Sequence, residues 1–223
     1  MAIQVAIDGP AGSGKSTVAR LVAQRLGYLY IDTGAMYRAL TLKAMRLGLP
    51  LDDEKEVLTL LVRTRLELLP GETTRVLLDG EDVSAAIRLP DVNRGVSKVA
   101  ALGKVRHQLV ELQRELAKGD VVMDGRDIGT VVLPEAKVKV FLTASISERA
   151  KRRALELKAR GIEVSQEQAE QDLAWRDQLD EGREVGPLKQ APDAYLLDTT
   201  ELTIPQVVER ILSLCQEVLA REA

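Results

Sequence analysis

The chain has 223 residues, 45% of them apolar, and a formal net charge of −3. This length suits one α/β domain with insertions and is too short for two large domains. A dedicated nucleic-acid-binding protein usually carries a strong basic excess, so the charge predicts no nucleic-acid partner. A single cysteine, Cys215, excludes an internal disulfide and a zinc site made of several cysteines. Its apolar neighbours predict a buried, inert thiol.

The single histidine, His107, lies between Arg106 and Gln108 in a helical pattern. This setting predicts a solvated or capping side chain, and a Ser-His-Asp or Cys-His site would have no other base. No apolar run approaches the roughly 18 residues of a membrane span. The N-terminus also lacks the basic leader and apolar core of a signal peptide. We therefore expect a cytoplasmic protein with no membrane partner.

Strand and helix patterns alternate along the chain. Short β-rich runs predict strands at residues 3–7, 28–32, 120–124, 137–143 and 194–200. Apolar residues at helical spacing predict helices at 15–26, 35–48, 53–65, 91–101, 104–119 and 203–223, and two charged helices between 145 and 180 with a break near 160–165. Apolar runs separated by turn residues, including the turn at 70–74, predict a small antiparallel insertion at about 65–90. The alternation indicates one α/β domain over residues 1–223, with a parallel sheet flanked by helices.

The segment "GPAGSGKS" fits the phosphate-loop motif G-x-x-x-x-G-K-[ST] without a mismatch, between a strand and a helix. Its glycines let backbone N–H groups surround a phosphate, and the helix N-terminus adds partial positive charge. Lys15 would reach the β- and γ-phosphates, and the Ser16 hydroxyl would hold Mg²⁺. The predicted phosphate-binding residues are Gly9, Pro10, Ala11, Gly12, Ser13, Gly14, Lys15, Ser16 and Thr17. The sequence therefore predicts a P-loop NTPase fold that binds ATP with Mg²⁺.

The loop alone does not say where the phosphate goes. A guanine-reading N-K-x-D motif is absent, because the only asparagine, Asn93, is followed by Arg94. Motor and AAA-type ATPases usually have longer chains and a strand that ends in acidic residues. The remaining interpretation is an enzyme that transfers the phosphate to a small acceptor.

Three further segments are candidates for the acceptor side. In "DTGAMYR" a hydroxyl, a glycine and an arginine at a helix start suit a phosphoryl acceptor, although Thr33 as a cap and Arg38 as an exposed side chain would explain the pattern too. Ser97 and Arg106 would lie on opposite faces of one continuous helix, but a break at Leu102 would let both face one site.

The third segment, "WRDQLDEGR", places Arg176, Asp180 and Arg183 on one helical face, as a functional group or as a solvated ion-pair row. Before it, the charged segment at about 148–165 would close over the triphosphate and exclude water. Its predicted lid residues are Arg149, Arg152 and Arg153.

In "VVMDGRDIGT" two aspartates and an arginine follow a short apolar run. Asp124 and Asp127 could be an acid and a base or could bind a metal, whereas Arg126 between them favours an anion. The residues of this segment alone do not decide among these roles.

Together these segments resemble the bacterial-type cytidylate kinases, which are P-loop nucleoside monophosphate kinases that act on CMP and dCMP. The resemblance covers essentially the whole chain and is carried by "IDGPAGSGKST", "DTGAMYR", "LDGEDVS", "SKVAALGKVR", "DGRDIGTVV", "ERAKRR" and "LLDTT". The P-loop is common to many families, but "DGRDIGTVV" with "DTGAMYR" and the β insertion is specific.

The resemblance implies transfer of the γ-phosphate of ATP to CMP or dCMP by a monomer, with a CMP-binding region at about 33–100. The implied CMP-binding residues are Thr33, Arg38, Ser97, Arg106, Arg126, Asp127, Arg176 and Asp180. Of these, Arg38 and Arg126 would clamp the α-phosphate, Thr33, Ser97, Arg106 and Asp127 would surround cytosine, and Arg176 and Asp180 would contact the ribose. The implied catalytic residues are Lys15, Arg126, Arg176 and Arg183. Ser16, and Asp124 through water, would hold the metal.

Overall fold

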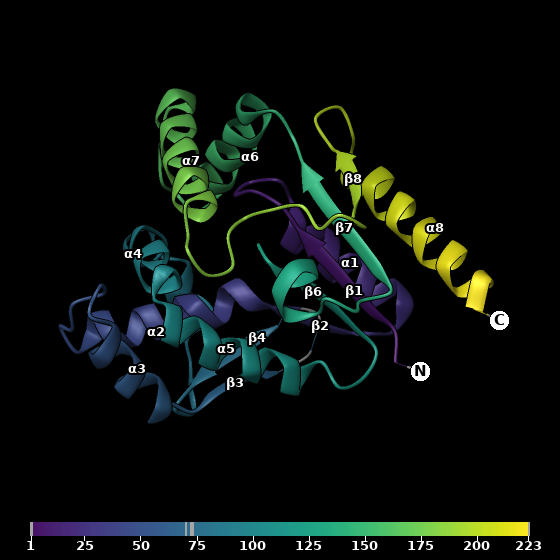
Figure 1. Ribbon diagram of the computed structural model, residues 1–223. Helices are drawn as coiled ribbons and strands as arrows, with labels where there is room; N and C mark the ends of the chain where they lie inside the picture. Colours follow the sequence, from purple (N-terminus) through teal and green to yellow (C-terminus); the bar gives the residue numbers. More distant parts are fainter. Residues whose placement is uncertain (1, 70, 72–73, 223) are drawn as a thin grey trace.

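The computed structural model describes residues 2–69, 71 and 74–222 of the chain, and side chains as far as residue 220. Within this part, five strands form a parallel sheet in the order β2-β6-β1-β7-β8 (Figure 1). Their bounds are Gln4–Asp8 (β1), Leu29–Asp32 (β2), Val121–Asp124 (β6), Val138–Thr143 (β7) and Tyr195–Asp198 (β8). The five strands predicted from the sequence are thereby confirmed, each within two residues.

The side chains of β1 alternate between the two faces of the sheet, as strand geometry requires. Val5 and Ile7 belong to a buried cluster with α1 (Lys15–Leu26) and α8 (Ile204–Glu222). Ala6 belongs to a second cluster, which includes residues of α5 (Gly103–Leu116). In Figure 1, α8 runs beside β7 and β8. Helices thus flank the parallel sheet, and the glycine-rich loop between β1 and α1 completes the predicted P-loop NTPase fold.

The predicted insertion follows β2. Helices α2 (Thr33–Arg46) and α3 (Glu54–Val62) lead to a three-stranded antiparallel sheet of β3 (Leu66–Leu69), β4 (Arg75–Leu78) and β5 (Glu81–Asp82). A short 3-10 turn at Ala86–Arg88 then precedes α4 (Pro90–Ala101). Residues of β4, of this turn and of α4 pack on α2 in one buried cluster. The antiparallel insertion is confirmed, while Pro70, Glu72 and Thr73 of the predicted turn lie outside the described residues.

Two helices form the predicted charged pair, α6 (Ile146–Ala159) and α7 (Gln166–Glu181). They lie side by side at the upper left of Figure 1. The prediction that Arg183 shares the α7 face with Arg176 and Asp180 is wrong, because α7 ends at Glu181 with Gly182 as its C-cap. Glycine favours helix termination because it loses the most backbone freedom in a helix.

A π-helical turn at Ile128–Val132 follows β6 and was not predicted. The Val132 N–H donates to the Asp127 carbonyl over 3.1 Å, which is the five-residue spacing of a π turn. Its residues read as an apolar run, so hydrophobic periodicity gives no sign of it. The turn fixes the chain immediately after Asp127.

Two single residues, Cys215 and His107, lie as the sequence predicted. Cys215 is buried, and burial raises the pKa of its thiol to about 11. His107 is exposed on α5. No helix in the described part of the chain is both long and apolar enough to cross a membrane.

The first glycine of the phosphate loop packs too closely for any side chain. Gly9 has φ 144°, and an added Cβ would lie 2.0 Å from the Leu142 carbonyl oxygen of β7. We expect Gly9→Ala to lower the free energy of unfolding by about 2–4 kcal/mol in urea titrations, because it adds backbone strain and overpacking. Gly119→Ala is the control, since nothing lies within 4 Å of that position. Equal stability of the two variants would contradict this account.

Candidate functional site

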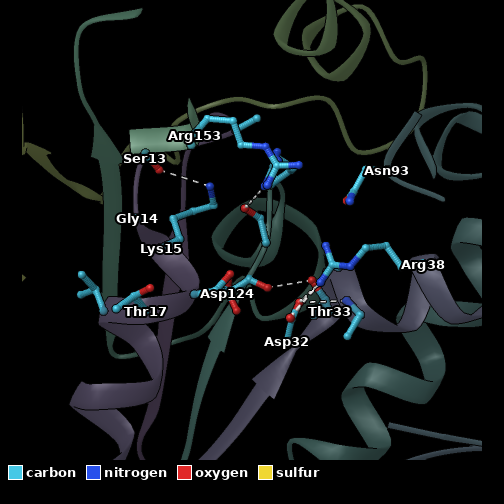
Figure 2. Close-up of a pocket in the computed structure, with 18 of the residues that line it drawn as sticks. Ser13, Gly14, Lys15, Thr17, Asp32, Thr33, Arg38, Asn93, Asp124 and Arg153 are labelled. Carbon is cyan, nitrogen blue, oxygen red and sulfur yellow. Dashed lines mark hydrogen bonds and ion pairs between the residues drawn. The ribbon is translucent and has the colours of Figure 1, made fainter. Parts of the chain in front are cut away.

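A cavity of about 770 Å³ opens at the carboxyl ends of β1, β2 and β6. The phosphate loop, α2, α4, the start of α5 and the end of α7 surround it. In Figure 2, Asp124 lies between Lys15 on one side and the pair of Arg38 and Asp32 on the other. Ligands of parallel α/β sheets bind at this edge, where polar groups from several loops converge.

Most residues predicted from the sequence line this one cavity. They are Ala11, Gly12, Ser13, Gly14, Lys15, Ser16, Thr17, Thr33, Arg38, Ser97, Arg106, Asp124, Arg126, Asp127, Arg152, Arg153, Arg176, Asp180 and Arg183. Gly9, Pro10 and Arg149 do not line it. The segments that seemed separate in the sequence therefore meet in space.

The phosphate loop folds back on its own lysine. Lys15 Nζ donates to the Pro10 carbonyl oxygen at 2.6 Å and to Ser13 Oγ at 3.2 Å. Burial, together with the charge of Arg126, lowers the pKa of Lys15. The ammonium thus has protein oxygens as partners at the place where a phosphate would supply stronger, charged ones.

Asp124 lies beside the start of α1. Ser16 Oγ donates to its Oδ2 at 2.7 Å, and the Tyr30 hydroxyl donates to its Oδ1 at 2.8 Å. Burial, and then the charge of Asp32, raises the pKa of Asp124 to about 6. A hydroxyl and a carboxylate side by side fit Mg²⁺, which binds through few protein oxygens and keeps water and phosphate oxygens as its other ligands. The described residues contain no cluster of three His, Cys, Asp or Glu side chains that could hold a metal ion.

The two aspartates of "VVMDGRDIGT" have different partners. Asp127 pairs with Arg106, whereas Asp124 contacts Ser16 and Tyr30. The two carboxylates are therefore not hydrogen-bonded to each other. Arg126 Nε donates to Asp180 Oδ2 at 2.7 Å.

Buried carboxylates hold the arginines around the acceptor side of the cavity. Asp180 accepts from both Arg126 and Arg183 and is 1% exposed, so the alternative of a solvated ion-pair row does not hold. Burial, and then the charge of Arg126, lowers the pKa of Arg176 to about 9. The Nε atoms of Arg38, Arg106, Arg176 and Arg183 are buried without a hydrogen-bond partner. Buried unpaired donors are costly, so this region is suited to an anionic ligand.

We name the part of the cavity lined by Arg106, Tyr37 and Asp127 the recess around Arg106. The Arg106 guanidinium donates to the Ala100 carbonyl oxygen at 3.0 Å, pairs with Asp127 and lies 5.3 Å from the centre of the Tyr37 ring. The predicted break at Leu102 is present between α4 and α5, and it lets the buried Ser97 and Arg106 line the same cavity. A planar ring with hydrogen-bonding edges would meet a donor, an acceptor and an aromatic neighbour here.

Asp8 was missed in the sequence, although "AIDGP" places it at the end of the first strand. Its carboxylate accepts from the backbone N–H groups of Ile128 and Gly129 at 2.8 and 2.7 Å. Burial raises the pKa of Asp8 to about 6, against the lowering effect of these two hydrogen bonds. Asp8 thus ties the phosphate-loop strand to the π turn and orients the adjacent Asp127.

Of the three predicted lid residues, Arg152 and Arg153 line the cavity, whereas Arg149 faces the phosphate loop. Arg149 is 7% exposed, donates to the carbonyl oxygens of Ala11 and Ala144, and pairs with Asp177. Arg152 lines the cavity and donates to Thr199. Asp177, also missed in the sequence, accepts from the Ala11 N–H at 3.0 Å. Helices α6 and α7 therefore bind the backbone C=O and N–H groups of Ala11 in the phosphate loop.

The family model described as cytidylate kinase matches residues 5–217. The chain belongs to the cytidylate kinase family. It is 54% identical over 213 residues to a cytidylate kinase of Desulfitobacterium hafniense (strain Y51), covering 95% of this chain and 92% of the relative. It is 53% identical over 214 residues to a cytidylate kinase of Carboxydothermus hydrogenoformans (strain ATCC BAA-161 / DSM 6008 / Z-2901), covering 95% and 96%.

Among solved structures, an uncharacterized protein from Eubacterium ventriosum ATCC 27560 aligns with a TM-score of 0.52. The identity is 13%, and the alignment covers 97% of this chain and 99% of that chain. This likeness concerns the fold alone.

A substitution at Asp177 tests whether α7 supports the phosphate loop through its contact with Ala11. Asp177→Asn keeps an oxygen for the Ala11 N–H but removes the charge opposite the buried Arg149. We expect calorimetric affinity for ATP to fall about tenfold, since an unpaired buried charge is costly. Asp172→Asn, at an exposed position on the same helix, should bind ATP like the wild type. Unchanged ATP affinity in Asp177→Asn would show that this contact of α7 does not support the loop.

Proposed function

We propose that the chain transfers the γ-phosphate of ATP to CMP or dCMP, giving ADP and CDP or dCDP. The observation that carries the proposal is that one cavity brings the required groups together in a member of the cytidylate kinase family. This cavity joins a complete phosphate loop to a group of buried arginines and to the recess around Arg106 and Asp127.

On the donor side, the N–H groups of the phosphate loop would bind the triphosphate, and Lys15 would exchange the Pro10 oxygen for phosphate oxygens. Ser16 and Asp124, the latter through water, would hold Mg²⁺. Bound there, Mg²⁺ would neutralise the charge on the phosphates. Arg152 and Arg153 would close the donor side against water.

On the acceptor side, Arg38 and Arg126 would bind the α-phosphate of CMP, and Arg176 and Asp180 would contact its ribose. Ser97 and Thr33, with Arg106 and Asp127, would surround cytosine. Arg126, Arg176 and Arg183 would stabilise the charge that develops during transfer, together with Lys15. The acceptor phosphate is already ionised at neutral pH, so positioning and charge stabilisation suffice without a strong general base. The exposed position of the only histidine, His107, is compatible with this chemistry.

We further infer that the protein acts as a monomer in the cytoplasm. The phosphate loop, the arginines and the recess around Arg106 all come from one chain, so no second copy is required to complete the site. Free nucleotides are the expected partners, and the net charge of −3 does not favour nucleic acid.

A panel of nucleoside monophosphates tests the proposal. With ATP and Mg²⁺, we expect ADP to form rapidly with CMP and dCMP and much more slowly with UMP or AMP. A clear preference for AMP would contradict the assignment of the acceptor. ADP formation that is independent of any monophosphate would indicate a nucleotide-dependent switch that hydrolyses ATP slowly.

A substitution at Arg126 tests whether this side chain belongs to the acceptor side of the cavity or to the donor side. We expect Arg126→Ala to lower turnover by about 10²-fold or more, because one donor to the transition-state charge is lost. Affinity for ATP, measured by calorimetry, should stay close to that of the wild type. A comparable loss of ATP affinity would instead assign Arg126 to the donor phosphates.

A further inference from the structure

The buried carboxylate of Asp32 is shared by arginines from two parts of the chain. Asp32 Oδ2 lies 2.9 Å from Arg38 Nη2 of α2 and 2.9 Å from Arg88 Nη2 of the 3-10 turn that ends the β insertion. Its Oδ1 accepts from the Ala35 N–H, which caps α2. Asp32 is 3% exposed, whereas the Arg88 side chain is 41% exposed and lines the cavity. Arg88 was not among the residues singled out in the sequence.

Arg38 Nη2 would have to divide its hydrogen bonds between Asp32 and an acceptor phosphate. Arg38 Nη2 is the atom bonded to Asp32, and turning it toward a phosphate would break that bond, while Arg38 Nε has no hydrogen-bond partner. Once Arg38 shifts, Asp32 must keep a counter-charge, because a buried carboxylate without one is costly. Asp124 increases this need, since its charge and that of Asp32 oppose each other.

The charges around Asp32 agree with this requirement. Burial alone would raise the pKa of Asp32, but the charges of Arg38 and Arg88 lower it overall. Arg88 is the partner that can stay when Arg38 leaves, because it reaches Asp32 from the insertion and not from α2.

We propose that Arg88 is a positioning residue for the acceptor: by neutralising Asp32, it releases Arg38 to bind the acceptor phosphate. The inference rests on the proposed function of the cavity. It also links the β insertion to the phosphate site, because the Arg88 ion pair fastens the end of the insertion to the edge of the sheet beside β2.

A double-mutant cycle tests the inference. We expect Arg88→Met to raise the KM for CMP about tenfold with little change in kcat or in the KM for ATP, because a hydrogen bond to a charged group is lost. Arg88→Lys keeps the charge and should recover most of the affinity. Asp32→Asn removes the carboxylate charge but retains a good N-cap for α2. In that background, Arg88→Met should change the KM for CMP less than about twofold.

Two controls make this test specific to the ion pair between Arg88 and Asp32. Arg94→Met removes an exposed arginine of α4 that pairs only locally with Asp91, and it should behave like the wild type. Retained ATP binding in calorimetry shows that each variant is folded. An unchanged KM for CMP in Arg88→Met would overturn the inference, and so would a tenfold effect that persists in Asp32→Asn, which would make Arg88 a direct phosphate ligand. Failure of the proposed function itself would appear as a wild-type enzyme that does not phosphorylate CMP.

Discussion

Like-charge repulsion among buried arginines is the constraint on which the rest of this site depends. An acceptor phosphate needs several cations close together, and the same cations repel one another in the free protein. Five arginines of the cavity are each paired with a buried carboxylate. Asp32 holds Arg38 and Arg88, Asp180 holds Arg126 and Arg183, and Asp127 holds Arg106. On the proposed function, a substrate phosphate would compete with these carboxylates for the arginines.

Helix α7 connects the two halves of this arrangement. Asp177 accepts from the phosphate loop at Ala11, and Asp180, less than one turn later, accepts from Arg126 and Arg183. Asp8 makes a second connection, from the strand before the loop to the π turn after Asp127. We therefore expect a shift of the phosphate loop to move the arginines that Asp180 binds. Such coupling suits a reaction in which two anionic phosphates have to be aligned before transfer.

The sequence predicts well what local pattern determines and poorly what distant pairing determines. The phosphate loop, the strands and the break at Leu102 each follow from motif, periodicity or a helix-breaking residue, and the structure agrees. The contacts between distant residues do not follow from local pattern. Asp32 and Arg88, and likewise Ala11 and Asp177, are brought together only by the fold. Helical spacing also could not show that Gly182 ends α7 before Arg183, nor that Arg149 turns toward the loop.

If carboxylates pair with the arginines in the free protein, the affinity for the acceptor reflects the exchange of a carboxylate for a phosphate. A phosphate dianion offers more charge and more acceptor oxygens than one carboxylate, so it can draw Arg38 away from Asp32. A nucleoside without a phosphate has no negative charge that could replace Asp32 beside Arg38, even if its base fits the recess around Arg106 and Asp127. On the proposed function, the paired carboxylates would disfavour uncharged ligands as well as reduce repulsion among the arginines. Selection for a phosphorylated acceptor would then follow from how the free site is neutralised, in addition to the contacts made by a bound substrate.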